Sequence, residues 1–387
     1  GDAVNDLSAG GAGGSVYITC KTFGGASTGL IRADGGNSTI VAQSGGGGGG
    51  RIAVNYQSLS PSREVRFSAA PASISWAYGD ITNRWHDMPM PGTLWLPDTQ
   101  LLSTTLDNTK FAGAVSIVGI TNWVIPSLNV NNSHVIFAQP AATIKISGDI
   151  VIGSGGSLGI GNPYGGSDYA LHCGGSFILT NGGQLYAFGG LTNAAGKNYG
   201  TFVGVTNSLI VNSGSWIHPV SHWTNGGSAF FVVGNLFVGT NAGFNAAGKG
   251  YRGTSGPGSR GMISCVYLPG ASHGGRGGCY PASGNNGWAA NTYGSVSYPI
   301  TAGSGGAGYP SHHGNAGHGG GVIRIEVNGA ATIHGILSAN GAKPHVEHGA
   351  GGAGGSIYIK CATFSGTSSG LITANGGNGY SGTTSGA

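Results

Sequence analysis

A small group of ionisable side chains around Trp85 has the residue types of a polysaccharide-cleaving site. The group consists of Asp80, Arg84, His86 and Asp87. Two carboxylates that flank a sugar can act as acid and base, and an indole ring offers a surface on which the sugar stacks. The whole chain, however, holds only nine Asp and three Glu, scattered over 387 residues. We therefore interpret the group as a salt-bridged loop and expect no catalytic centre.

His218 and His222 lie four residues apart and could share a metal ion. Because Pro219 interrupts the strand between them and no third ligand is close in the sequence, we expect neither a metal site nor another cofactor. Strings of the GxGxxG type recur, but none follows a strand and opens a helix, as a nucleotide site requires. Other histidines would form a metal-binding or pH-sensitive cluster if the glycine-rich segments that carry them meet. They are His273, His312, His313, His318, His345 and His348.

The five cysteines are too scattered for a zinc ribbon or a CxxC redox motif. Cys265 and Cys279 lie in one glycine-rich segment and could form a local disulfide in an extracellular setting. Cys20 and Cys361 each follow an alternating apolar run, so we interpret them as small buried side chains of a strand.

The composition is unusual for a soluble domain. Glycine supplies 81 of the residues and charged residues only 7%, against roughly 7% glycine and 25% charged residues in an ordinary domain. The hydrophobic fraction of 39% is enough for a core, so we expect the chain to fold. Because the net charge is only +4, we expect no nucleic-acid partner and no attraction to an anionic membrane. We also expect no membrane span and no intact signal peptide at Gly1.

One stretch of the chain occurs twice. Residues 10–37 return as residues 351–378, 341 positions later, with 20 of 28 residues identical and no insertion. Self-similarity at a fixed period is typical of repeat proteins. We interpret the chain as one period, with an overlap of about 46 residues, of an array that continues at both ends. The two copies should form the same coil at opposite ends, related by one screw operation with a translation on the order of 50 Å.

A shorter rhythm runs inside this period. Gly320–Ile325, Gly354–Ile359 and Gly49–Val54 each combine a glycine pair with an alternating strand. Each is followed or preceded by a second strand that ends in Ala-Asn-Gly or Ala-Asp-Gly, which tolerate the positive φ of a sharp corner. The strands should therefore turn without pairing back as hairpins.

The short strands fit either an antiparallel sandwich or a β-solenoid. Similar strands recur in register and the pattern closes after 341 residues, so the sequence favours an all-β, right-handed parallel β-helix (β-solenoid) with long glycine-rich loops. Val16, Ile18, Ile357 and Ile359 should point inward. The intervening tyrosines, Tyr17 and Tyr358, should point outward.

We divide the chain into five regions. Residues 1–55 and 321–387 are β-helix coils, with 1–55 equivalent to 342–387 of the next period, and residues 107–248 are coils with short loops. Residues 56–106 are a Pro- and Trp-rich irregular excursion or a small cap. Residues 249–320 are a glycine-rich loop region, either disordered or built from packed extended chains. We favour ordered loops.

Several glycine-rich and aromatic strings are spread along the chain: GKGYRGTSGPGSRG, SHGGRGG, GHGGGVIRIEVNG, GGAGGSIYIKC, GTLWLPDTQLL and GSWIHPVSHWTNGGSAFF. This combination resembles the glycine-rich tandem-repeat regions of very large secreted or surface proteins of environmental bacteria. The resemblance implies tandem repetition, export and a β-helical structure, and brings no catalytic residues. At the level of fold the chain also looks like pectate-lyase-type and autotransporter-passenger β-helices, which implies nothing about activity.

The sequence thus favours a non-enzymatic, adhesin-like structural protein that joins end to end into an extracellular filament or cell-surface stalk. Its partner would be a further copy of itself, as tandem repeats or head-to-tail subunits, with glycans as a further possible partner. The alternative is a secreted polysaccharide-binding or polysaccharide-degrading β-helix protein. An enzyme protects its open sheet edges with caps, whereas neither end of this sequence has the pattern of a cap.

Overall fold

A computed structural model describes residues 10–37, 46–72, 89–162, 168–190, 199–263, 268–278, 288–309, 316–344 and 349–379. Within these ranges the protein is all-β, and every pairing between strands is parallel, which confirms the expected class. No helix long and apolar enough to cross a membrane occurs in them.

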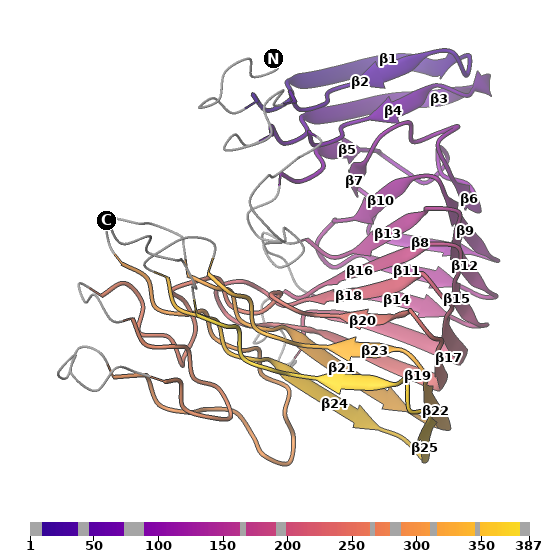
Figure 1. The fold of residues 1–387 in the computed structure, drawn as a ribbon. Coiled ribbons are helices and arrows are strands. Elements are labelled where there is room, and N and C mark those ends of the chain that lie inside the picture. Colours follow the sequence, from indigo (N-terminus) through magenta and orange to yellow (C-terminus); the bar gives the residue numbers. More distant parts are fainter. Residues whose placement is uncertain are drawn as a thin grey trace.

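One sheet runs the length of the molecule and contains eleven strands (Figure 1). In spatial order these are β1 (Ser15–Gly25), β3 (Arg51–Arg63), β5 (Thr93–Trp95), β7 (Val115–Val118), β10 (His134–Phe137), β13 (Ser157–Ile160), β16 (Gln184–Phe188), β18 (Trp216–Val220), β20 (Gly243–Asn245), β23 (Ile336–Ser338) and β26 (Leu371–Thr373).

A second sheet of thirteen strands stands beside the first. Its main path is β24 (Ser356–Lys360), β21 (Val322–Val327), β19 (Ala229–Val238), β17 (Thr201–Val211), β15 (Phe177–Leu179), β12 (Ile150–Gly153), β9 (Leu128–Asn131) and β6 (Thr105–Leu106). Off this path lie β8 (Asn122–Ile125), β11 (Thr143–Ile146), β14 (Tyr169–Cys173), β22 (Ala330–Ile333) and β25 (Thr363–Gly366). A third pair consists of β2 (Leu30–Arg32) and β4 (Arg66–Ser68).

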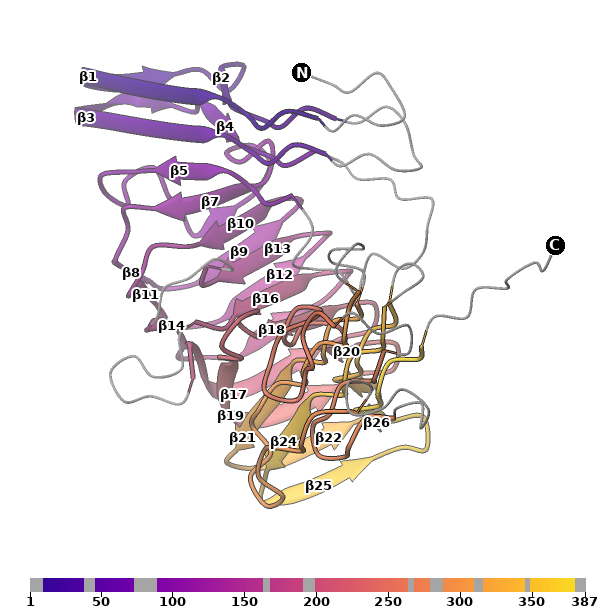
Figure 2. The same cartoon turned by 90° about the vertical axis from the view of Figure 1, so that its left-hand side faces the viewer.

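Along the chain, each strand of the eleven-stranded sheet except the last is followed by one or two strands of another sheet, and each strand pairs with a strand one circuit away (Figure 2). We call such a circuit a coil. Because the pairing is in register, apolar side chains stack on apolar side chains inside the coils. One such ladder runs through Ile144, Leu171, Val203, Phe231, Ile325 and Ile359. The result is one continuous core that extends from Phe23 to Ala339.

The expected alternation of exposure is present in β1, whereas in β24 Ile357, Tyr358 and Ile359 are all half-buried. Val16 and Ile18 pack against the core while Tyr17 between them is 73% exposed. Ile357 and Ile359 pack against the same core. The pattern of alternate apolar residues therefore predicted the inward face correctly.

The described parts of residues 249–320 are ordered chains without strands, and they form a lobe beside the last coils (Figure 1). Their backbones hydrogen-bond directly to one another: Tyr251 N–H donates to Gly303 C=O at 3.1 Å, and Gly303 N–H donates to Gly320 C=O at 2.8 Å. A Cβ atom on Gly319 would collide with the carbonyl of Gly303. Close backbone packing is thus the physical reason for the glycine content of this lobe.

A buried arginine attaches the lobe to the second sheet. The guanidinium of Arg324 on β21 lies 3.9 Å from the ring centroid of Phe230 on β19. It also donates a hydrogen bond to the hydroxyl of Tyr298 in the lobe. The Tyr298 ring in turn packs edge-on against Tyr358, with 4.8 Å between centroids. Cation–π and aromatic contacts of this kind stabilise a buried cation.

In the interval 56–106, β3 continues to Arg63 and strands β4, β5 and β6 join the sheets. Residues 73–88 of this interval lie outside the described parts of the chain.

The two copies of the repeated segment lie at opposite ends of the molecule (Figures 1 and 2). They differ in strand pattern and in the side they occupy: β1 is one strand at the end of the eleven-stranded sheet, whereas the equivalent residues 356–366 form two strands, β24 and β25, of the other sheet. A rotation from one side to another must therefore accompany the axial translation between the copies.

Candidate assembly edges at the two ends

The N-terminal coil (residues 10–37) and the C-terminal coil (residues 351–378) each leave one edge unpaired within the described chain. In the N-terminal coil, β1 pairs only with β3 and β2 only with β4, which follow them in sequence. In the C-terminal coil, β24, β25 and β26 pair only with β21, β22 and β23, which precede them. The N-terminal coil therefore leaves free the edge that would face a preceding coil, which we call the upstream edge. The C-terminal coil leaves free the edge that would face a following coil, which we call the downstream edge. Unpaired edges are templates for further strands.

A phenylalanine stands at the same position of the repeat in both coils, but its exposure differs between the two ends. Phe23 is only 6% exposed because its ring stacks near Tyr56 and Phe67 of the following coil, with centroids 6.1 and 6.4 Å away. Its equivalent Phe364 is 57% exposed. The difference comes from the covering coil, because the two residues occupy the same place in the repeat. Leu371 and Ile372 are exposed on the same coil.

Backbone hydrogen bonds join the N-terminal coil to its successor. Ala33 N–H donates to Ser68 C=O and Gly35 N–H donates to Ala70 C=O, both at 2.9 Å. The same pattern of hydrogen bonds joins the last two coils at the C-terminal end, where Gly341 N–H donates to Asn375 C=O at 2.8 Å.

The next groups in this series are the N–H groups of Ala374 and Gly376. Neither has a backbone acceptor within the described residues. Both residues are exposed, and unpaired N–H groups at a sheet edge are a template for a further strand. The C-terminal coil therefore presents the donors that the N-terminal coil uses to bind residues 68–70.

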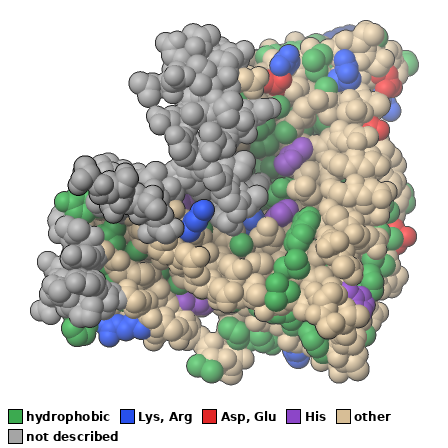
Figure 3. Space-filling model, viewed as in Figure 1, with side chains coloured by type: hydrophobic (Ala, Val, Ile, Leu, Met, Phe, Trp, Pro, Cys, Tyr) green, Lys and Arg blue, Asp and Glu red, His purple; other side chains and the backbone are tan. Residues whose placement is uncertain are grey.

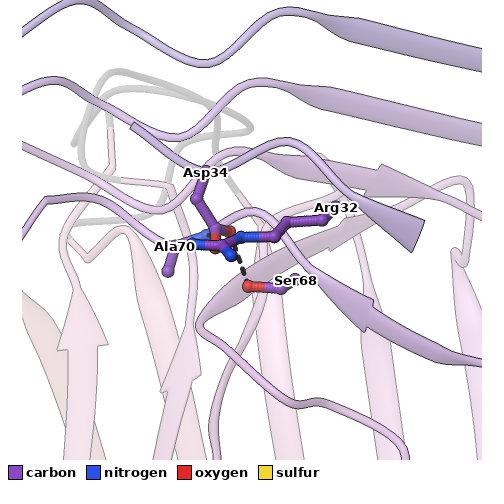
Figure 4. A network of polar contacts seen from close by, with 4 residues as sticks. All are labelled: Arg32, Asp34, Ser68 and Ala70. Atoms are coloured by element: carbon purple, nitrogen blue, oxygen red, sulfur yellow. Dashed lines mark hydrogen bonds and ion pairs between the residues drawn. The ribbon is translucent and has the colours of Figure 1, made fainter. Parts of the chain in front are cut away.

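A side chain at the corner of each coil strengthens the same junction (Figure 4). Asp34 Oδ1 accepts hydrogen bonds from Ala70 N–H at 2.7 Å and from the Ser68 hydroxyl at 2.5 Å, and Asp34 Oδ2 contacts Arg32 Nε at 2.5 Å. Burial acts to raise the pKa of Asp34, but these hydrogen bonds and the Arg32 charge together hold it below its usual value.

The same corner contact recurs near the other end with an amide in place of the carboxylate. Asn375 N–H donates to Asn340 Oδ1 at 2.7 Å. Asn375 is itself the equivalent of Asp34. Its side-chain oxygen is thus placed to accept a backbone N–H from a further coil.

A hollow of about 700 Å³ lies beside the downstream edge. The C-terminal coil lines it with Gly351–Ile357 and with Ala374, Gly376 and Gly377. The lobe lines the other side with Gly270, Ala271, His273–Gly278, Thr292–Val296 and Pro299. We call this space the terminal hollow. It is lined mainly by glycine backbone, so an extended chain could approach it closely.

The candidate catalytic residues Asp80, Arg84, His86 and Asp87 lie outside the described residues. On the face shown in Figure 3, Asp and Glu side chains are few and scattered.

The histidine pair is described in full. His218 is half-buried and stacks on Tyr186, with 4.5 Å between ring centroids. Burial, with the nearby charge of Lys249, lowers its pKa to about 3. His222 contacts the Thr224 hydroxyl through Nδ1 at 3.1 Å. No group of three or more His, Cys, Asp or Glu that could hold a metal occurs in the described parts of the chain.

Of the histidines in glycine-rich segments, only His273 and His318 lie within the described ranges. His273 contacts Gly354 C=O and the Thr301 hydroxyl, both at 2.9 Å, and so joins the lobe to the C-terminal coil. Its pKa is lowered, mainly by burial.

Both cysteines of the expected disulfide, Cys265 and Cys279, fall outside the described ranges. The described thiols of Cys20, Cys173 and Cys361 are free. Cys20 and Cys361 are half-buried and pack against the core.

Sequence reasoning missed Phe364 and Asn375 as candidate binding residues. The repeat itself pointed to them, because Phe364 and Asn375 repeat Phe23 and Asp34. In the sequence, a segment rich in aromatic and small residues follows Phe23 and Asp34. Comparison with family models, with curated proteins and with solved structures found no match to this chain.

Proposed function

We propose that this chain is one period of a right-handed parallel β-helix and serves as the structural repeat unit of an extracellular fibre or surface stalk. The observation that supports this best is the pair of equivalent coils with opposite free edges. A contact between such edges is head-to-tail and does not close on itself, so it generates an open filament.

The parallel, in-register strands support the same proposal. Eleven strands of one sheet separate the two ends by ten inter-strand steps. At about 4.8 Å per step, each period would add roughly 50 Å to the filament. Because the copies lie on different sides of the molecule, each period would also rotate about the filament axis.

A two-period protein tests this proposal. It joins residues 10–350 to residues 10–378, so that the natural 341-residue spacing is kept. Electron microscopy should show one straight rod, longer than the single period by roughly 50 Å. Two separate particles joined at varying angles would contradict the proposal, because the shared coil would then not connect the periods rigidly.

A further inference from the structure

Resting on the proposed function, we infer that the C-terminal coil binds residues 46–72 of a second copy and takes the place of that copy's own N-terminal coil. The partner is thus another molecule of this chain, and the contact is an exchange of equivalent coils.

The edge formed by β3 and β4 already binds the sequence in question. It pairs with residues 15–32, and residues 356–373 are identical to these at 11 of 18 positions. Transferring the observed register places Ile357 opposite Ile52 and Ile359 opposite Val54 of the second copy. Both pairs are apolar and inward-facing, so the exchanged coil continues the core.

The exchange also satisfies what the C-terminal coil leaves open. Tyr56 and Phe67 of the second copy would cover Phe364 as they cover Phe23. The carbonyl groups of Ser68 and Ala70 would accept hydrogen bonds from the N–H groups of Ala374 and Gly376. They now accept them from Ala33 and Gly35. A simple contact between two intact ends would instead place the repeated coil against itself, a pairing for which the structure offers no precedent.

The terminal hollow fits the glycine run that precedes β3. At the N-terminal end, Gly13 N–H donates to Gly48 C=O at 2.9 Å and Gly50 N–H donates to Ala33 C=O at 2.6 Å. The equivalents of Gly13 and Ala33 are Gly354 and Ala374, which both line the hollow. A Cβ on Gly50 would collide with the backbone of Gly14, so only a glycine run can occupy this position.

Deletion of residues 1–37 tests the exchange, because it exposes the β3 and β4 edge. Sedimentation velocity should show concentration-dependent head-to-tail oligomers for this variant. The matched control, which also lacks residues 349–387, should stay monomeric. Phe364→Ala in the first variant should weaken association at least tenfold. Equal association of the two deletion variants would overturn the inference.

Full-length chains provide a second test that does not depend on how the deletion variants fold. One chain carries Lys360→Cys and a differently tagged chain carries Asn55→Cys, both with Ser at positions 20 and 361. The inferred register places residues 360 and 55 side by side, as Thr19 and Asn55 are now. A mixed disulfide should form with Asn55→Cys. With Gln57→Cys, which lies about two residues or 6.6 Å along the strand, the yield of mixed disulfide should be at least tenfold lower.

The outcomes separate the two proposals. A straight two-period rod without the mixed disulfide would leave the fibre proposal standing and refute the exchange. Equal cross-linking at positions 55 and 57 would also refute it, since it would indicate non-specific contact.

Discussion

Truncation of the two equivalent phenylalanines should have very different effects. Phe23 is buried between the aromatic rings of the next coil, whereas Phe364 is 57% exposed. Removal of a buried Phe side chain from a core costs about 3 to 5 kcal/mol. We expect the lower end, about 3 kcal/mol, for Phe23→Ala in a terminal coil. Phe364→Ala should cost less than about 1 kcal/mol, as for other exposed positions.

Hydrogen exchange is the suitable assay, because coils at the end of a repeat protein open locally before the whole chain unfolds. A loss of about 3 kcal/mol corresponds to a factor on the order of 100 in exchange rate. Phe23→Ala should accelerate the β1 and β3 amides by that factor. Phe364→Ala should change β24 and β21 by less than about fivefold. Equal accelerations would refute the view that the downstream edge is uncovered.

Three further predictions follow from the same contacts. Asp34→Asn should reduce protection of β2 and β4 at pH 7. The difference from the natural chain should vanish as the pH falls through the lowered pKa of Asp34, because the carboxylate stabilises the fold while it is charged and loses this effect when it is protonated. Hydrogen exchange of the two chains at each pH measures this difference. The natural chain should show no turnover of acidic or neutral polysaccharides. Robust turnover that Asp80→Ala or Asp87→Ala abolishes would contradict the proposal that the chain is a structural protein without a catalytic centre. Gly319→Ala should open the lobe to limited proteolysis, whereas Gly274→Ala, where a Cβ meets nothing within 4 Å, should not.

Local patterns in the sequence predicted the strands well. Alternation around Tyr17 gave the inward face, and Asn-Gly or Asp-Gly corners correctly excluded hairpins. These features depend on neighbouring residues alone, so a single sequence contains them.

Other features depend on contacts between distant segments. The lobe is held by backbone contacts between glycines, and glycine carries no side-chain pattern from which a partner can be read. The burial of Arg324 depends on Phe230 and Tyr298, which are far from it in sequence and meet only in the fold. The difference in exposure between Phe364 and Phe23 likewise follows from contacts between coils, because residues of the next coil cover Phe23.

The most direct test of the account is electron microscopy of the material that contains this chain in its native setting. The account predicts filaments with a 4.8 Å spacing along the axis and a repeat of roughly 50 Å, each repeat rotated relative to the last. Discrete particles of a single period, with both end coils covered by other elements, would contradict it.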